Sequence, residues 1–351
     1  MVIFRAVTRL ALLLPLFITP VWSHSGPGGI LRPDSLADLA PHPQSSRNYN
    51  EFWTYQFRLN DSIQIQVNLS RASFGSFKDP VCGGDFALMG FKGRDYFVAR
   101  EYKSRNFNFD PVKARLSVHE QIFFEGRPPQ AHRLFFSTAK KGTAYFLDLS
   151  FEDMTQGLVW GDGVFHLQDG QRMGLFFHIP KARVHGRIAI NGDTVNVNGS
   201  GWMDHTYQTD FATKLIDAGY RFVAFPKSLH STSPIEGGFF FQYGSSAFGY
   251  GLREEKDHWT LLRPKEIKTV ERGSCGSVNV ARKLEINYEG ASPTRFQREK
   301  DRQSNSPLQE LSRMERFGAR FFLGGEIYGC RGTGLINDSL SAIYSFTVIK
   351  R

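Results

Sequence analysis

Short apolar runs separated by turn residues make up most of the chain. Phe52–Leu59 and Ile63–Leu69 are two such runs, and the Asn-Asp-Ser turn between them is typical of a β-hairpin. In the second run, apolar residues alternate with Gln64, Gln66 and Asn68. This alternation indicates a strand with one face in the core and the other in water. The pattern therefore predicts antiparallel strands.

Similar runs continue to the end of the chain with one interruption. An Asn191-Gly192 turn gives a further hairpin signal. The helix-like segment Thr209–Ala218 then separates two groups of strands. We predict an all-β fold of two tandem antiparallel β-barrel domains, with the boundary between Trp202 and Gly219, because closed barrels leave no exposed strand edge.

Composition agrees with a folded β protein. The 351 residues are 41% hydrophobic and 22% charged, with 32 Phe and 34 Gly, which argues against disorder. Charge-rich Arg295–Arg316 is expected to be a surface loop or helix. The formal net charge is +9, but no long basic run occurs, so we expect no nucleic-acid partner. A basic surface of this kind can favour anionic lipid, and therefore peripheral membrane contact. The oligomeric state stays open.

The N-terminus resembles an export signal. Basic Arg5 and Arg9 precede an apolar run of about 13 residues that is too short to span a bilayer comfortably. We expect cleavage after residue 23 and a mature protein, periplasmic or secreted, that starts near His24. An uncleaved anchor is the alternative. Residues 24–47 are rich in Pro, Ser and Gly and predict a flexible lead-in.

Three cysteines cannot all pair with one another in an oxidising compartment. Cys275 and Cys330 are the expected disulfide, and Cys82 the expected buried free thiol. The chain has no C-x-x-C and no Cys/His zinc spacing. His178, His185 and His205 lie near one another in the sequence, but no carboxylate or Cys spacing accompanies them, so we expect no metal. It also lacks phosphate-binding glycine motifs, so we expect no cofactor.

The most informative segment follows the Asn-Gly hairpin. Gly199-Ser200-Gly201 leads directly into Trp202-Met203-Asp204-His205. In a strand, Trp202 and Asp204 share one face and His205 points to the other. A large aromatic side chain and a carboxyl group would then lie together on the first of these faces.

This Gly-x-Gly-Trp-Met-Asp-His motif resembles the lipocalin-like carotenoid hydratase family (hydroxyneurosporene synthase), which includes AttH-like exported proteins. The Glu51–Leu59 segment, EFWTYQFRL, resembles the start of the same domain. The resemblance implies two tandem lipocalin-like β-barrels, here 48–210 and 211–351. In the fungal pericyclase relatives, a large apolar substrate lies between the barrels. Thr206-Tyr207-Gln208 departs from the family pattern after the motif, which puts a specific hydratase activity in doubt.

Three roles remain open for the motif. Asp204 can act as an acid with Trp202 as a cation-stabilising wall, it can contact a ligand, or it can only hold the barrel together. His205, on the other face of the strand, is the third catalytic candidate. Trp53, Tyr55 and Tyr207 are the candidate ligand-binding aromatics. We therefore expect an exported protein that binds a hydrophobic small molecule or lipid in an apolar pocket. The alternatives are a hydratase, lyase or isomerase acting on a polyene or terpenoid, and a structural protein of the cell envelope.

Overall fold

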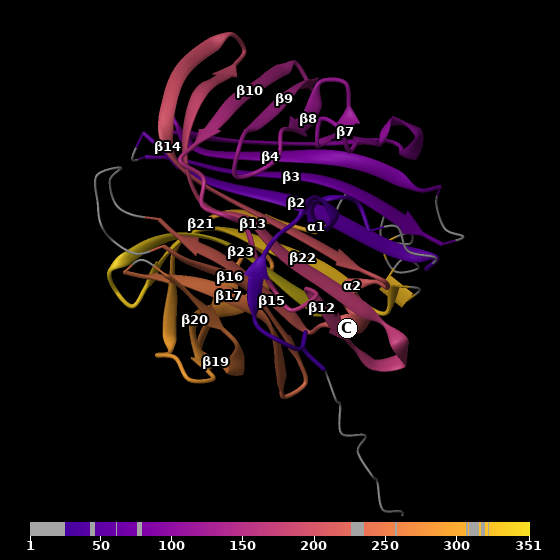
Figure 1. Ribbon diagram of the computed structural model, residues 1–351, viewed down its shortest axis with the longest axis vertical. Coiled ribbons are helices and arrows are strands. Elements are labelled where there is room, and N and C mark those ends of the chain that lie inside the picture. The colour runs from indigo at the N-terminus through magenta and orange to yellow at the C-terminus, as the bar shows by residue number, and fades with distance from the viewer. Residues whose placement is uncertain are drawn as a thin grey trace, which may run out of the picture.

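The chain folds into two antiparallel β-sheets, in agreement with the all-β prediction (Figure 1). The computed structural model describes residues 25–42, 46–60, 62–75, 79–225, 235–256, 258–306, 308, 316, 320, 321 and 323–351. The predicted export signal lies outside these residues. Within the described part of the chain, no helix is long and apolar enough to cross a membrane.

The first sheet contains fourteen strands in the described residues, and its main path runs β5-β4-β3-β2-β14-β13-β10-β9-β8-β7-β6. It curls so that β7 packs against β3 and β4, and the apolar core lies inside this half-barrel (Figure 1). Its strands are β1 (Leu31–Pro33), β2 (Asn48–Leu59), β3 (Ile63–Phe74), β4 (Val81–Phe91), β5 (Arg94–Lys103), β6 (Asn108–Asp110), β7 (Arg115–His119), β8 (Ile122–Glu125), β9 (His132–Lys140), β10 (Thr143–Glu152), β11 (Leu158–Trp160), β12 (Val164–His166), β13 (Arg172–Ile190) and β14 (Asp193–Gln208).

The second sheet contains nine strands in the described residues, in the order β18-β17-β16-β15-β23-β22-β21-β20-β19. It encloses a second apolar core. Its strands are β15 (Ala218–Ala224), β16 (Glu236–Tyr243), β17 (Ser246–Glu255), β18 (His258–Leu262), β19 (Pro264–Cys275), β20 (Val278–Tyr288), β21 (Thr294–Asn305), β22 (Glu326–Ile336) and β23 (Leu340–Lys350).

The chain passes from one sheet to the other between Gln208 and Ala218. Only the four residues of α2, Ala212–Leu215, are helical in the predicted helix Thr209–Ala218. The helix prediction was therefore wrong for most of its length, because Ala218 already pairs with both β16 and β23.

The prediction of a loop or helix from residue 295 was wrong up to residue 305. This stretch is β21, which pairs with β20 and β22. The many charged residues did not indicate a strand in the sequence. In the structure most of them point outward, while Phe296 and Arg298 point inward. Arg298 is buried because its guanidinium donates hydrogen bonds to the carbonyls of Ala281 and Gly273.

The segment before β2, for which the sequence predicted a flexible lead-in without periodicity, contains a strand and a short helix. Its strand β1 pairs with β11. The short helix α1, Leu36–Leu39, begins with a capping box in which Ser35 and Asp38 satisfy each other's backbone N–H groups. The indole of Trp53 then donates to the Leu39 carbonyl at 3.0 Å. Local caps and pairing thus replace the missing hydrophobic periodicity.

The predicted wet face of β3 is also wrong. Gln66 is 1% exposed, because the second sheet covers this face of the first (Figure 1). Side chains from both sheets form one apolar cluster between them, which includes Trp202, Phe177 and Tyr250. The interface between the sheets is therefore as buried as either core.

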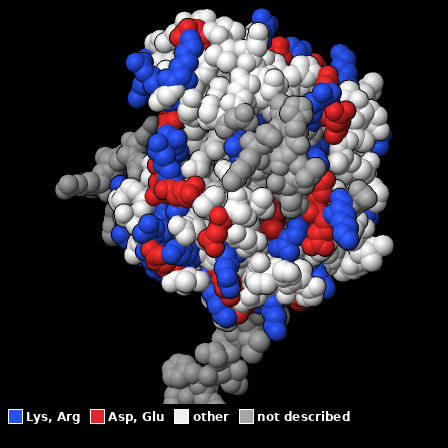
Figure 2. Space-filling view, turned by 90° about the vertical axis from the view of Figure 1, so that its left-hand side faces the viewer, with Lys and Arg blue, Asp and Glu red and all other residues white. Residues whose placement is uncertain are grey.

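A disulfide joins Cys275 on β19 to Cys330 on β22, and Cys82 is a buried free thiol. The bond crosses the interior of the second sheet, since both sulfurs belong to its core cluster. On the outer surface, basic and acidic side chains lie beside one another over much of the face in Figure 2. The positive net charge is thus spread among opposite charges on that face.

Candidate functional site

The alternation of β14 sends the residues of the Trp-Met-Asp-His motif to opposite sides of the first sheet. Trp202 and Asp204 face the second sheet, and the Trp202 indole N–H donates to Asp204 Oδ2 at 3.3 Å. His205 faces the other way and stacks on Trp53, with ring centroids 4.4 Å apart. The motif therefore contributes to two separate environments.

Asp204 forms an ion pair across the interface with Arg221 of β15. Asp204 Oδ1 lies 3.0 Å from Arg221 Nη2, and the two side chains are 1% and 9% exposed. Burial raises the pKa of Asp204, and the Arg221 charge opposes that shift. A guanidinium stays protonated in proteins, so it favours the carboxylate form of Asp204, although the effect of burial is larger and the pKa remains raised. The Arg221 guanidinium also lies 4.1 Å from the centre of the Phe239 ring.

An aromatic wall adjoins this pair. Phe177, which pairs with Asp204 across the β13–β14 ladder, packs edge-on against Trp202 and Tyr250 with centroids 5.1 and 4.7 Å away. A Cβ added at Gly237 of the second sheet would lie 3.1 Å from the Trp202 ring, so glycine there permits the close approach. The wall is thus shared by both sheets.

Polar side chains continue from Asp204 across the neighbouring strands. Cross-strand pairing aligns Asp204 with Thr54 and Asn68, and aligns Trp202 with Gln56 and Gln66. At the far end Asp85 pairs with Arg331 of the second sheet at 2.8 Å. We call this set the inter-sheet polar layer; its residues are Thr54, Gln56, Gln66, Asn68, Asp85, Asp204, Arg221 and Arg331.

The polar side chains at the centre of the layer have no hydrogen-bond partners among the described residues. Both amide atoms of Gln56 and of Gln66, and the hydroxyl of Thr54, are buried and form no hydrogen bond with any described residue. The three residues are at most 1% exposed. Buried polar groups are nearly always paired, so each exception calls for an explanation. The surroundings of Asp204 are therefore part aromatic and part polar, not the wholly apolar pocket that the sequence suggested.

The predicted ligand-binding aromatics do not lie in this layer. Trp53 and Tyr55 are fully buried in the core of the first sheet, where the Tyr55 hydroxyl lies 2.8 Å from His132 Nε2. Tyr207 lies in a small cluster with Phe176 on the His205 face. The structure therefore brings Trp202 and Asp204 together and separates them from the other three aromatics and from His205.

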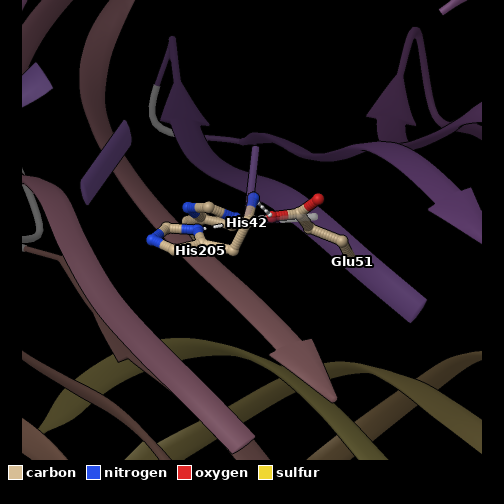
Figure 3. Close-up of side chains that lie close together, drawn as sticks. All are labelled: His42, Glu51 and His205. Atoms are coloured by element: carbon tan, nitrogen blue, oxygen red, sulfur yellow. Dashed lines mark hydrogen bonds and ion pairs between the residues drawn. The ribbon is translucent and has the colours of Figure 1, made fainter. Parts of the chain in front are cut away.

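The His205 face carries a hydrogen-bonded chain of titratable groups. His178 Nδ1 lies 2.8 Å from Asp34, and its Nε2 lies 3.4 Å from His205 Nδ1. On the other side of the ring, His205 Nε2 lies 2.9 Å from Glu51 Oε1, which also accepts from the His42 backbone N–H (Figure 3). Burial lowers the pKa of His205 to about 4. Burial tends to raise the pKa of Glu51, but the neighbouring His205 and His42 groups bring it to about 2.

Sequence reasoning missed Arg221, Gln56, Gln66 and the partners of His205. Gln66 belongs to the polar face of an alternating strand, but the alternating pattern is the same whether that face contacts water or a second sheet. Arg221 and Asp204 are separated by a change of sheet, so no local spacing relates them. His42 and Glu51 come from a segment and a strand that only tertiary packing joins to β14.

Solved structures with the same fold exist at low sequence identity. An AttH-type protein of Nitrosomonas europaea has a TM-score of 0.57 at 13% identity, over 85% of this chain and 92% of its own. Kievitone hydratase of Nectria haematococca has 0.52 at 10%, over 86% and 88%. The protein CghA, solved with Sch210972, has 0.57 at 13%, over 92% and 94%. No family model and no curated protein matches the chain by sequence. The chain therefore has the AttH-like, lipocalin-like hydratase fold that its motif indicated.

Proposed function

We propose that this protein binds a hydrophobic small molecule or lipid that carries at least one hydrogen-bonding group, between its two sheets. The observation that carries the proposal is the pair of unpartnered amides, Gln56 and Gln66, in the buried polar layer. A ligand hydroxyl or carbonyl placed there would satisfy them. Its apolar part would reach Trp202 and Phe177 only if the two sheets move apart, because both rings are fully buried.

Burying these unpartnered polar groups costs free energy. Leaving a buried donor or acceptor without a partner costs about 1–3 kcal/mol. Two amides and the Thr54 hydroxyl together make this layer expensive for the protein alone. A protein that keeps such groups, instead of the aliphatic side chains that a core would favour, gains when a ligand completes their hydrogen bonds.

One of the similar structures supports the proposal because it was solved with a compound. CghA was solved with Sch210972, so one protein of this fold has been crystallised together with another compound. Because that similarity is at the level of fold, it contributes no residue roles here.

An enzymatic function is the second candidate, since kievitone hydratase shares the fold. Hydration of an isolated alkene needs an acid that keeps its proton at neutral pH. Burial raises the pKa of Asp204, as such an acid requires, but Arg221 at 3.0 Å opposes this shift by favouring the carboxylate. Binding is therefore the better-supported function, and Asp204 serves to join the two sheets.

Export is part of the same proposal. The Cys275–Cys330 disulfide suits an oxidising compartment, where such bonds persist. This is consistent with the signal-like N-terminus of the sequence.

The proposal is tested with three probes of graded polarity. Retinol and oleate each combine a long apolar chain with a polar end, whereas β-carotene is apolar throughout and has no polar end. We expect the tag-free protein to bind retinol or oleate more tightly than β-carotene in fluorescence titrations. Gln66→Leu should weaken binding of the polar probe about 3- to 10-fold, the value of one hydrogen bond.

Gln121→Leu is the matched control, because Gln121 is exposed in the turn before β8. It should bind all three probes like the wild type. Equal affinity for retinol, oleate and β-carotene, unchanged in Gln66→Leu, would contradict the proposal. Turnover of a probe that is lost in Asp204→Asn, with binding intact, would instead favour the enzyme.

A further inference from the structure

Three potential metal ligands meet on the face of β14 opposite the polar layer. His42 follows α1, Glu51 lies on β2 and His205 on β14, and their ligand atoms all lie within 4.8 Å of one another (Figure 3). Glu51 and His205 are fully buried, whereas the His42 side chain is 23% exposed. His42 Nδ1 is itself buried, so all three ligand atoms lie beneath the surface and only another part of the His42 ring is exposed.

The partners of His205 determine which of its nitrogens carries the proton. His205 Nδ1 lies 3.0 Å from the Asp38 carbonyl oxygen, which can only accept. Its other neighbour, His178 Nε2, is also an acceptor, because His178 Nδ1 is the nitrogen that donates to Asp34. Both contacts therefore place the proton on His205 Nδ1 and leave a lone pair on Nε2.

That lone pair points at another acceptor. His205 Nε2 lies 2.9 Å from Glu51 Oε1, and Glu51 Oε2 accepts no well-formed hydrogen bond from any described residue. Two electron-rich atoms at this distance repel unless a second ring proton or a metal cation lies between them.

The geometry points to a binding site for one first-row divalent metal ion, such as Zn²⁺, held by His42 Nδ1, His205 Nε2 and the Glu51 carboxylate. Metal–ligand bonds of about 2.0–2.2 Å separate neighbouring ligand atoms by about 3–3.5 Å. Glu51 Oε1 lies 2.9 Å from His205 Nε2 and 3.4 Å from His42 Nδ1, close to that range.

The surroundings match those of known metal-binding histidines. A ligating imidazole usually donates its other N–H to a carbonyl or carboxylate, which orients the lone pair toward the metal. For His205, the Asp38 carbonyl takes this role. Two imidazoles and one carboxylate leave at least one coordination position for water or a small ligand. The site is independent of the proposed ligand layer, which lies on the other face of β14.

The ion would also fix the N-terminal segment. His42 comes from the stretch that follows α1, and Glu51 and His205 belong to paired strands of the first sheet. The expectation of no metal rested on spacing along the sequence, and these three residues have no characteristic spacing. Only the fold assembles them.

The test uses tag-free, full-length protein stripped with EDTA and returned to chelator-free buffer. Calorimetric titration with Zn²⁺ should show one equivalent per chain, and Co²⁺ should give visible absorption bands typical of nitrogen and oxygen ligands. His42→Gln should weaken Zn²⁺ binding at least tenfold. His185→Gln is the control, because His185 is half exposed and lies outside the cluster.

Two outcomes overturn the inference. One is the absence of saturable one-to-one binding in the wild type, and the other is equal affinity in the wild type and His42→Gln. Nitrogen-15 NMR of the His205 ring gives a readout that needs no variant. We expect a bare Nε2 in the stripped protein whose signal shifts on adding Zn²⁺; a doubly protonated ring that Zn²⁺ leaves unchanged would also refute the site.

Discussion

The ion pair between Asp204 and Arg221 gives the sharpest prediction about the interface. Asp204→Asn keeps the shape of the side chain but removes its charge, so Arg221 becomes an uncompensated buried cation at 9% exposure. Breaking a buried pair in this way costs about 3–5 kcal/mol. We expect about 3 kcal/mol, at the lower end, because Arg221 keeps its contact with the Phe239 ring.

Urea denaturation at pH 7 measures this loss. The control is Asp193→Asn, which removes an ion pair with Lys92 whose partners are both more than half exposed, and it should cost less than about 1 kcal/mol. Arg221→Met added to Asp204→Asn should recover part of the loss, because no buried charge is then left alone. A loss below about 1 kcal/mol for Asp204→Asn would refute the reasoning, since it would mean that Asp204 is already protonated and neutral.

Three further predictions concern stability and processing. Burial lowers the pKa of His132 to about 4. The contribution of His132 to the free energy of unfolding is therefore complete above pH 6.5 and is lost as the pH falls to about 4. His132→Gln should flatten the dependence of stability on pH in this range, and an unchanged slope would contradict the prediction. Reducing the Cys275–Cys330 bond, which closes a separation of 55 residues, should lower the free energy of unfolding by about 4 kcal/mol in urea melts. N-terminal sequencing of exported protein should begin at or near His24; an intact apolar run would reject cleavage.

The fold was largely accessible from the sequence because its signals are local. Asn-Gly turns and period-two alternation identify hairpins such as β13–β14 without knowledge of the rest of the chain. Segments whose order comes from tertiary contact were misjudged. The Leu31–Leu39 region is held by caps and by pairing with β11, and Thr294–Asn305 is a strand because β20 and β22 flank it.

Only part of the candidate site could be predicted from the sequence. Alternation correctly places Trp202 and Asp204 on one face of β14 and His205 on the other. It cannot show that the first face meets Arg221 from another sheet, or that Gln66 is buried there. The sequence therefore left the role of Asp204 open, and the structure shows that it forms an ion pair with Arg221.

The location of the bound molecule tests the central proposal most directly. A photoreactive diazirine analogue of oleate, cross-linked to the wild-type protein and mapped by peptide mass spectrometry, reports where the apolar chain lies. We predict labels on peptides of β2, β3 and β14, on the face that carries Gln56, Gln66 and Trp202, with competition by unlabelled oleate and reduced labelling in Gln66→Leu. Labels confined to the concave core of the first sheet, around Phe124 and Phe136, or labelling that unlabelled oleate does not compete, would contradict binding between the sheets.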